Sequence, residues 1–292
     1  HLRKCFPLKK TITGKVTQEL IAVDDVSFKL KAGETLGIVG ESGCGKTTMG
    51  RAILKLHQPS GGQIIFNGQD ITKFKSSQMR EIRKQMQIIF QDPYSSLDPR
   101  MTVLDIIKEP LLANFPKMPK AEMERRVMDI AAKVGLNTSY LKRYPHAFSG
   151  GQRQRIGIAR ALATKPEFVV CDEPVSALDV SIQAQVINMF HELQQQLGLT
   201  YLFIAHDLSV VRYFADRIAV IHNGRIVEVA PTEELFKYPL HPYTLSLLQA
   251  VPMPDPQIEK AKELVVYDES KRDLSGESRS CERSVRVTSY LP

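Results

Sequence analysis

The chain has 292 residues, 43% of them hydrophobic, and carries 39 Lys and Arg against 32 Asp and Glu. Its length allows a hydrophobic core without disulfides, and no apolar run approaches the roughly 18 to 20 residues that a membrane-spanning helix needs. The basic residues are scattered rather than blocked. The net charge of +7 could suit a nucleic acid, an anionic membrane surface or phosphorylated ligands, but the scatter of the charges favours an ordinary solvated surface. We expect no nucleic-acid partner.

The first 40 residues favour β-strands. Residues 22–30 alternate in part between apolar and polar side chains, and Thr35–Val39 is a short apolar run. The pattern then predicts a helix from Lys46 to about Leu56. The pair Asn67-Gly68, which follows Gln63–Phe66, predicts a type I′ hairpin because both central residues of that turn need positive φ.

Residues 92–148 change in character and predict helices. Within Lys120–Val134, apolar residues recur at helical spacing with Arg and Glu between them. Pro119 stands at the start of this segment and Gly135 at its end, which is the usual placement of these residues around a helix. We therefore predict an inserted helical subdomain.

The α/β pattern returns from residue 166. The apolar runs Phe168–Cys171 and Tyr201–Ala205 flank a predicted helix at 180–197, which favours a parallel sheet covered on both faces. Asn223-Gly224 predicts a second hairpin. The tail after about residue 253 loses periodicity, and no regular structure is predicted there.

A glycine-rich segment between a predicted strand and a predicted helix matches the P-loop pattern; we call Gly40–Thr47 the P-loop. Its glycines would let the backbone wrap phosphate oxygens, which then face successive N–H groups and a helix N-terminus. Lys46 would reach the β- and γ-phosphates, and the Thr47 hydroxyl would ligate Mg²⁺. The alternative, a glycine-rich turn without a ligand, does not explain the adjacent Lys46-Thr47 pair.

A second segment, Ser149–Gln152, opens another predicted helix; we call it the signature segment. Ser149 is a good N-cap, and the two glycines that follow leave backbone amides accessible. Alone, this segment would be an ordinary helix start.

Two carboxylates, Asp172 and Glu173, follow the apolar run Phe168–Cys171. Ligands bind at this end of the strands in open α/β sheets, and two carboxylates beside a triphosphate favour a bound cation. Asp172 suits a Mg²⁺ contact, and Glu173 suits polarising the attacking water. The alternative is a surface Asp-Glu pair, which rarely follows four buried apolar residues.

In this order of motifs the chain resembles the nucleotide-binding subunits of ABC transporters over residues 1–235. Gln91 at a strand end, Ser176–Asp179 after the carboxylates and His206 after Tyr201–Ala205 fall where that family expects them. Three further segments resemble the second ATPase subunit of dipeptide and oligopeptide importers: residues 91–100, 144–146 and 241–244. Nickel and glutathione importers share much of this pattern.

The resemblance implies an α/β fold: a P-loop NTPase (RecA-like) core with a parallel sheet, an N-terminal antiparallel β subdomain and an inserted helical subdomain. The core would comprise residues 1–91 and 162–235, the helical subdomain 92–161, and a partly irregular C-terminal extension 236–292. The resemblance also implies that two such domains pack head to tail, with ATP between the P-loop of one and the signature segment of the other.

The resemblance assigns roles residue by residue. Ser149 and Gly151 would contact the γ-phosphate of the partner's nucleotide, and Phe6 would stack on adenine unless it is a core residue of the first strand. The residues expected to bind nucleotide are Phe6, Gly40, Glu41, Ser42, Gly43, Cys44, Gly45, Lys46, Thr47, Thr48, Ser149, Gly150, Gly151, Gln152 and Asp179. The residues expected to take part in catalysis are Lys46, Gln91, Glu173 and His206. The residues expected to bind Mg²⁺ are Thr47, Gln91 and Asp172.

The expected cofactors are ATP and Mg²⁺. The expected partners are two integral membrane permease subunits, a second and non-identical ATPase subunit, and a solute-binding protein reached through the permease, at the cytoplasmic face of the cell membrane. Related subunits often carry a cysteine-rich C-terminal segment, but Cys281 stands alone in that region, so no iron–sulfur cluster is expected. The wide spacing of all four cysteines also argues against a zinc site.

Cys44 lies at a helix N-terminus beside Lys46, a setting that lowers a thiol pKa. We therefore expect alkylation of Cys44 to block ATP binding, and ATP to protect the thiol. Two other functions remain open from sequence: a soluble ABC ATPase of translation or DNA repair, and a P-loop regulatory switch without a transport role. The single domain and short helical insert weigh against the first, and the signature segment with Asp172-Glu173 weighs against the second.

Overall fold

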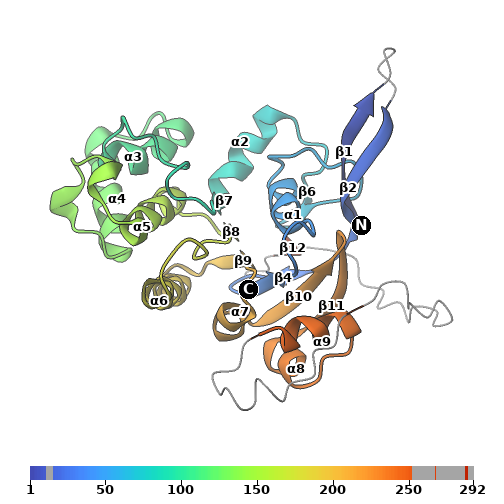
Figure 1. The fold of residues 1–292 in the computed structure, drawn as a ribbon. Helices are drawn as coiled ribbons and strands as arrows, with labels where there is room; N and C mark the ends of the chain where they lie inside the picture. The colour runs from blue at the N-terminus through green and yellow to red at the C-terminus, as the bar shows by residue number, and fades with distance from the viewer. Residues whose placement is uncertain (11–15, 252–266, 268–286, 289–292) are drawn as a thin grey trace.

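A six-stranded, mostly parallel sheet lies at the centre of the molecule (Figure 1). The computed structural model describes residues 1–10, 16–251, 267 and 287–288. The strand order is β11-β10-β4-β9-β8-β7, and every neighbouring pair is parallel except β10 with β11. These strands are β4 (Thr35–Val39), β7 (Met86–Ile89), β8 (Phe168–Asp172), β9 (Thr200–Ile204), β10 (Arg217–His222) and β11 (Arg225–Pro231).

Both faces of this sheet are covered by helices, because β4, β8 and β9 are buried along their whole length. Alternate residues of β8 enter different hydrophobic clusters: Phe168 and Val170 pack with α1 (Lys46–Ile53), whereas Val169 and Cys171 pack with α6 (Val180–Leu197) and α7 (Leu208–Phe214). The near-continuous apolar runs therefore form strands buried on two sides, as predicted.

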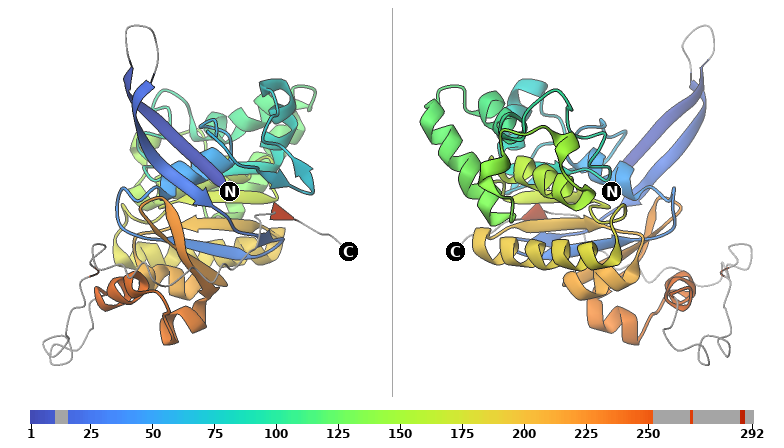
Figure 2. Two further views of the ribbon diagram at one scale, coloured as in Figure 1. Left: turned by 90° about the vertical axis from the view of Figure 1, so that its right-hand side faces the viewer. Right: turned by 60° about the vertical axis from the view of Figure 1, so that its left-hand side comes forward.

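Short antiparallel pairs surround the N-terminal half of the core. β1 (Leu2–Lys10) and β2 (Val16–Val26) form a hairpin that projects from the molecule (Figure 2), and β5 (Ile65–Phe66) pairs with β6 (Gln69–Asp70). A further pair, β3 (Leu30–Lys31) with β12 (Val287–Thr288), is parallel. Both predicted Asn-Gly turns are confirmed: φ is 48° and 76° at Asn67-Gly68, and 47° and 76° at Asn223-Gly224.

A helical lobe stands beside the sheet (Figure 1). It contains α3 (Val103–Asn114), α4 (Lys120–Lys133) and α5 (Gly150–Leu162), with 3₁₀ turns at Thr138–Tyr140 and Pro145–Ala147. The buried side chains of α4 are Met123, Val127, Ile130 and Ala131, so its apolar stripe faces the other helices. The prediction of helices in this region is confirmed, and α4 matches the predicted segment to within one residue.

Several elements differ from the sequence expectations. Helix α1 ends at Ile53 rather than near Leu56, because Lys55 adopts a positive φ of 53° and its buried ammonium group donates to the carbonyls of Ile71 and Phe74. Helices α2 (Ser76–Gln85) and α7 were not predicted. Helix α8 (Thr232–Lys237) spans the boundary placed after residue 235, and α9 (Pro242–Gln249) follows it. In the tail, where no regular structure was expected, the structure describes Tyr267 and the short strand β12 (Val287–Thr288); the rest of the tail, with Cys281, lies outside the described residues.

Close packing of α7 on β4 depends on the lack of a side chain at Gly37. A Cβ there would lie 2.2 Å from Val211 Cγ1 and 3.1 Å from the Cβ of Ala215. We expect Gly37→Ala to lower the free energy of unfolding by about 1–3 kcal/mol through overpacking, measured by urea denaturation. Gly157→Ala is the matched control, since a Cβ on Gly157 of α5 meets nothing within 4 Å; it should be neutral or stabilising. Equal stabilities of Gly37→Ala and wild type would contradict this packing.

Candidate active site

The P-loop follows β4 at the carboxyl edge of the sheet and leads directly into α1. Its glycines are required by both conformation and space: Gly40 and Gly45 have φ of 152° and 105°. A Cβ on Gly40 would lie 2.2 Å from the carbonyl oxygen of Ile221, and one on Gly45 would lie 2.1 Å from that of Ala22. The loop is therefore pressed against the backbones of β10 and β2, where a larger residue would displace it.

Lys46 begins α1 and is almost fully buried, at 3% exposure. Its Nζ donates to the carbonyl oxygen of Gly40 at 2.7 Å and to that of Glu41 at 2.8 Å. Nζ also lies 4.0 Å from the Cys44 sulfur. The ammonium group therefore points into the loop, as a lysine expected to bind phosphate should.

Asp172 ends β8 with its carboxylate fully buried. Oδ1 accepts from the Thr47 hydroxyl at 2.6 Å, and Oδ2 lies 3.4 Å from Nη2 of Arg51. The structure thus joins two of the three residues predicted at Mg²⁺. Hydroxyl and carboxylate oxygens are ligands that Mg²⁺ prefers. Among the described residues no three His, Cys, Asp or Glu side chains form a metal cluster, so Mg²⁺ here would also rely on phosphate oxygens and water.

Two of the other predicted catalytic residues, Gln91 and His206, lie at the carboxylate of Glu173. Oε2 accepts from Gln91 Nε2 at 2.9 Å and lies 3.4 Å from His206 Nδ1. Gln91 lies just beyond β7, and His206 lies just beyond β9. The Glu173 backbone has a positive φ of 47°, and its N–H donates to the Ile204 carbonyl at 3.0 Å. Two side chains that follow separate strands therefore meet at the carboxylate of Glu173, which itself follows a third strand.

The signature segment forms a capped helix end. Ser149 is the N-cap of α5: its Oγ accepts from the Gln152 N–H, and its own N–H donates to the Gln152 side chain at 3.0 Å. Ser149 and Gln152 are exposed. Asp179, the N-cap residue of α6, is also exposed and makes no capping hydrogen bond with its side chain.

The signature segment lies next to α6, since a Cβ on Gly151 would come 2.7 Å from Ile182 Cγ2. Across the described residues, no hydrogen bond joins the signature segment to the P-loop. The structure therefore brings together the P-loop, Asp172 and the Glu173 group, but it leaves the signature segment apart from them.

Phe6 lies on β1 and is half-buried. Its ring meets the edge of His57 at a centroid distance of 5.6 Å, and Lys4 Nζ lies 4.7 Å from its ring centroid. It is therefore not a fully buried core residue. Stacking of adenine on Phe6 stays a prediction.

The expected pKa of Cys44 is wrong. The thiol is 9% exposed, and burial raises its pKa above the usual value, outweighing the opposing effect of Lys46. A protonated, buried thiol reacts slowly at neutral pH, so the reason given for expecting a reactive Cys44 is removed. That alkylation would block ATP binding, and that ATP would protect the thiol, stay predictions.

Sequence reasoning missed Arg51, which contacts Asp172 from the same face of α1 as Thr47. The four-residue spacing of Thr47 and Arg51 was the signal that could have revealed it, because such residues are neighbours on a helix surface. Arg51 supplies a positive charge beside a buried carboxylate, which lowers the cost of burying it.

Comparisons with known proteins agree with this geometry. Residues 23–176 match the ABC transporter family, and residues 227–282 match the family described as oligopeptide/dipeptide transporter, C-terminal region. The chain is 57% identical to the oligopeptide transport ATP-binding protein OppF of Bacillus subtilis (strain 168), over 94% of this chain and 88% of that protein. It is 55% identical to the dipeptide transport ATP-binding protein DppF of Lactococcus lactis subsp. cremoris (strain MG1363), over 88% of this chain and 83% of that protein.

Solved structures show the same fold. The dimeric ATP-binding cassette MJ0796, in a post-hydrolysis state with ADP and Pi, matches with a TM-score of 0.70 and 27% identity, over 79% of this chain and 96% of that one. The cbiO1 protein of Clostridium perfringens, part of the ABC transporter complex cbiONQ, matches with a TM-score of 0.69 and 25% identity, over 81% of this chain and 90% of that one.

The α/β fold and the resemblance inferred from the motifs are thereby confirmed. No helix within the described part of the chain is both long and apolar enough to cross a bilayer. From the matched core, the matched C-terminal region and the relatives that align over nearly its whole length, the chain belongs to the ABC transporter family, as an ATP-binding subunit of its oligopeptide/dipeptide branch.

Proposed function

We propose that this chain binds and hydrolyses ATP to drive an importer of di- and oligopeptides. The observation that carries the proposal is the match to oligopeptide and dipeptide ATP-binding proteins over nearly the whole chain, including the C-terminal region. The partners would be two permease subunits, a second ATPase subunit and, through the permease, a solute-binding protein, at the cytoplasmic face of the membrane. The alternative solutes are nickel and glutathione, and the test below distinguishes them from peptides.

Phosphate binding would begin when the Lys46 ammonium group exchanges its present hydrogen-bond acceptors for phosphate oxygens. Its ammonium group now contacts the carbonyls of Gly40 and Glu41, which are neutral acceptors. Anionic phosphate oxygens are stronger acceptors for a cation, so they would replace these carbonyls while backbone N–H groups hold the remaining oxygens. Thr47 and Asp172 would hold Mg²⁺, which when bound neutralises charge on the phosphates.

Hydrolysis would take place at Glu173. Its carboxylate can accept a hydrogen bond from the attacking water and polarise it. Gln91 and His206 both lie beside Glu173 Oε2, so each can position that water or the γ-phosphate. A second anion-binding helix end would complete the stabilisation of the negative charge on the γ-phosphate during hydrolysis.

The second helix end would come from the partner ATPase. In the signature segment Ser149 and Gln152 are exposed, the helix end is already capped, and no hydrogen bond among the described residues joins the segment to the P-loop of its own chain. The solved MJ0796 cassette is dimeric. In a head-to-tail pair, Ser149 and Gly151 would face the nucleotide held by the partner, and Asp179 would reach across the interface.

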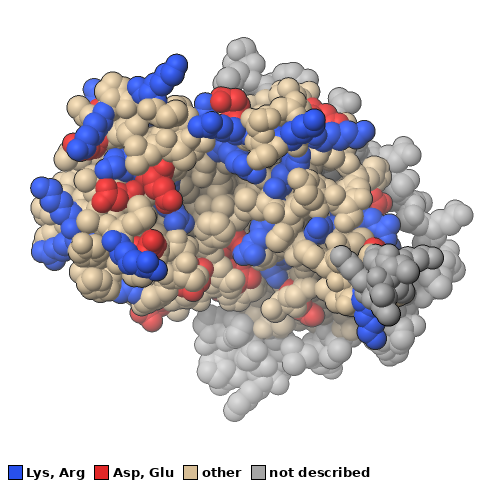
Figure 3. Space-filling model, turned by 90° about the horizontal axis from the view of Figure 1, so that it is seen from above, with Lys and Arg blue, Asp and Glu red and all other residues tan. Residues whose placement is uncertain are grey.

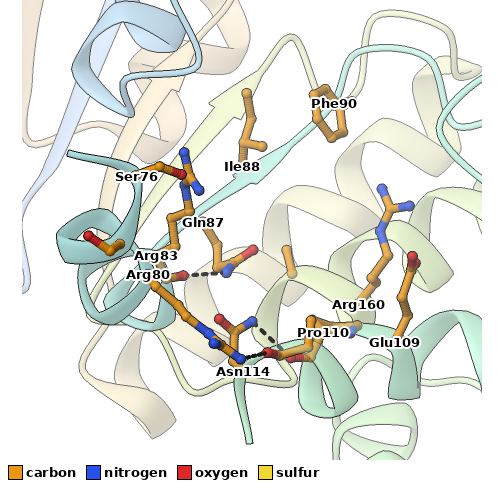
Figure 4. Close-up of a pocket in the computed structure, with 13 residues that line it drawn as sticks. Ser76, Arg80, Arg83, Gln87, Ile88, Phe90, Glu109, Pro110, Asn114 and Arg160 are labelled. Carbon is orange, nitrogen blue, oxygen red and sulfur yellow. Dashed lines mark hydrogen bonds between the residues drawn. The ribbon is translucent and has the colours of Figure 1, made fainter. Parts of the chain in front are cut away.

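The permease would dock between the sheet and the helical lobe. A cleft of about 660 Å³ lies there, lined by residues of α2, β7, α3 and α5 and by none of the residues expected to bind nucleotide (Figure 4). Arg80, Arg83 and Arg160 face it against one carboxylate, Glu109. This charge suits a permease segment that carries a carboxylate. On the face of the molecule that Figure 3 shows, acidic and basic side chains are mixed.

The transported solute can be tested by uptake. In cells that lack this chain, we expect uptake of a radiolabelled tripeptide to fall to background and to return with the wild-type gene but not with Lys46→Ala. Uptake of ⁶³Ni²⁺ and of labelled glutathione, measured in the same cells, should stay unchanged. Normal tripeptide uptake without the chain would refute the peptide proposal.

The role of Glu173 predicts separation of binding from turnover. Glu173→Gln keeps the shape of the side chain but removes the charge that polarises water, so we expect kcat of ATP hydrolysis to fall about 100-fold or more while ATP binding is retained. An ATP-dependent dimer should accumulate in size-exclusion chromatography. Lys46→Ala, the matched control, should instead weaken binding itself. Undiminished turnover in Glu173→Gln would remove Glu173 from this role.

The docking cleft predicts an effect of charge reversal. Arg83 is exposed on α2 and faces the cleft, so Arg83→Glu should reduce co-purification with the permease subunits. The ATPase rate of the isolated subunit should not change. Arg125→Glu makes the same charge change on α4, outside this cleft, and should leave the complex intact. Equal loss of permease in both variants would refute docking at this cleft.

A further inference from the structure

One peptide group of the P-loop is held from both sides. The carbonyl of the Gly40–Glu41 peptide accepts from Lys46 Nζ at 2.7 Å, and its N–H donates to the hydroxyl of Tyr243 at 3.1 Å. The C=O and N–H of a trans peptide point in opposite directions. Lys46 therefore contacts this peptide from the inside of the loop, and Tyr243 contacts it from the opposite side.

Tyr243 comes from α9, 202 residues beyond Glu41, and is itself firmly placed. Its side chain is 1% exposed, and its ring packs against His222 and Tyr267 at centroid distances of 4.1 and 5.6 Å. Burial raises the pKa of Tyr243 to about 12, so the hydroxyl stays neutral over the physiological range.

The start of α9 is anchored to β11. The two carboxylate oxygens of Glu228 accept from the N–H groups of Leu240 at 2.9 Å and His241 at 3.0 Å. The His241 ring then accepts from the Tyr243 N–H at 3.1 Å. A continuous set of contacts thus runs from Glu228 through the first turn of α9 to the P-loop.

We propose that Tyr243 is a positioning residue that fixes the orientation of the Gly40–Glu41 peptide and thereby keeps the P-loop in the conformation that binds nucleotide. The inference rests on the phosphate-binding role proposed above for the P-loop. Gly40 restrains the adjacent peptide little, since it has no Cβ. When phosphate draws Lys46 away from the Gly40 carbonyl, the contact with Tyr243 remains to hold that peptide.

The consequence is a measurable change in affinity. Without the hydroxyl, the loop populates its binding conformation for a smaller fraction of the time, and the apparent Kd rises by the inverse of that fraction. The loss of one hydrogen bond corresponds to a rise of about 3- to 10-fold. Chemistry at Glu173 is untouched, so KM for ATP should rise while kcat stays within about twofold.

The test compares Tyr243→Phe with Tyr201→Phe in the full-length chain. Tyr201 is also fully buried in an aromatic cluster, and its hydroxyl contacts the Phe190 carbonyl rather than the P-loop. Titration with Mg²⁺ and a non-hydrolysable ATP analogue, well below the unfolding temperature, should show the higher Kd in Tyr243→Phe alone. The ATPase assay of the assembled transporter should show the change in KM.

A second variant guards against misfolding. Glu228→Gln loses one acceptor at the start of α9 and should raise the Kd in the same direction but less. An unchanged Kd in Tyr243→Phe, or an equal rise in Tyr201→Phe, would overturn the inference. Lys46→Ala separates the two proposals. If Lys46→Ala binds the analogue like wild type, the phosphate-binding role of the P-loop fails. If Lys46→Ala weakens binding but Tyr243→Phe leaves the Kd unchanged, only the positioning role of Tyr243 fails.

Discussion

The site depends on the hydrogen-bonded register of the parallel strands. Ile204 of β9 pairs with Ile38 on one side and with Asp172 on the other, and Ile89 of β7 pairs with Cys171 of β8. Because the strands run in the same direction, the residues that leave their carboxyl ends emerge at one edge. A shift of one residue in this register would turn every second side chain to the other face. It would also separate the side chains that now meet: Gln91, Glu173 and His206.

In the proposed head-to-tail pair, each molecule would carry two incomplete halves of a site. The edge of the sheet supplies a cradle for phosphate and a group of polar side chains around Glu173, whereas the capped start of α5 lies in the helical lobe. Hydrolysis that needs both halves would be conditional on closure of two subunits, which links the chemical step to motion of the lobe. The cleft between lobe and sheet is where such motion would reach a permease.

Much of this arrangement could be predicted from sequence because it is local. Apolar runs predicted the buried strands, and Asn-Gly pairs predicted the two hairpins whose φ values are positive at both central residues. The P-loop and Asp172-Glu173 stood out because glycines, Lys and paired carboxylates follow apolar runs directly. Helix α2 was missed because it is short and mostly polar, so its weak periodicity did not separate it from a loop. Helix α7 was missed because it is only seven residues long, too short for its apolar residues to establish a helical period.

What could not be predicted depends on contacts between distant segments. The sequence around Cys44 suggests a reactive thiolate, but burial outweighs the neighbouring Lys46 and raises the pKa. Local sequence could not show that burial, since it arises when the loop is pressed against β2 and β10. The hydrogen bond between Tyr243 and Glu41 was equally invisible, because two segments separated by 202 residues meet only after folding.

The positive φ of Glu173 has a consequence for how this chain can be altered. A non-glycine residue in the left-handed region carries a conformational penalty on the order of 1 kcal/mol or more, which glycine or asparagine would relieve. The position proposed to activate water is thus one where thermal robustness and turnover oppose each other. Selection of variants for heat resistance alone would favour glycine or asparagine at residue 173, and such variants would lack the carboxylate proposed for turnover. Engineering for stability should therefore keep Glu173.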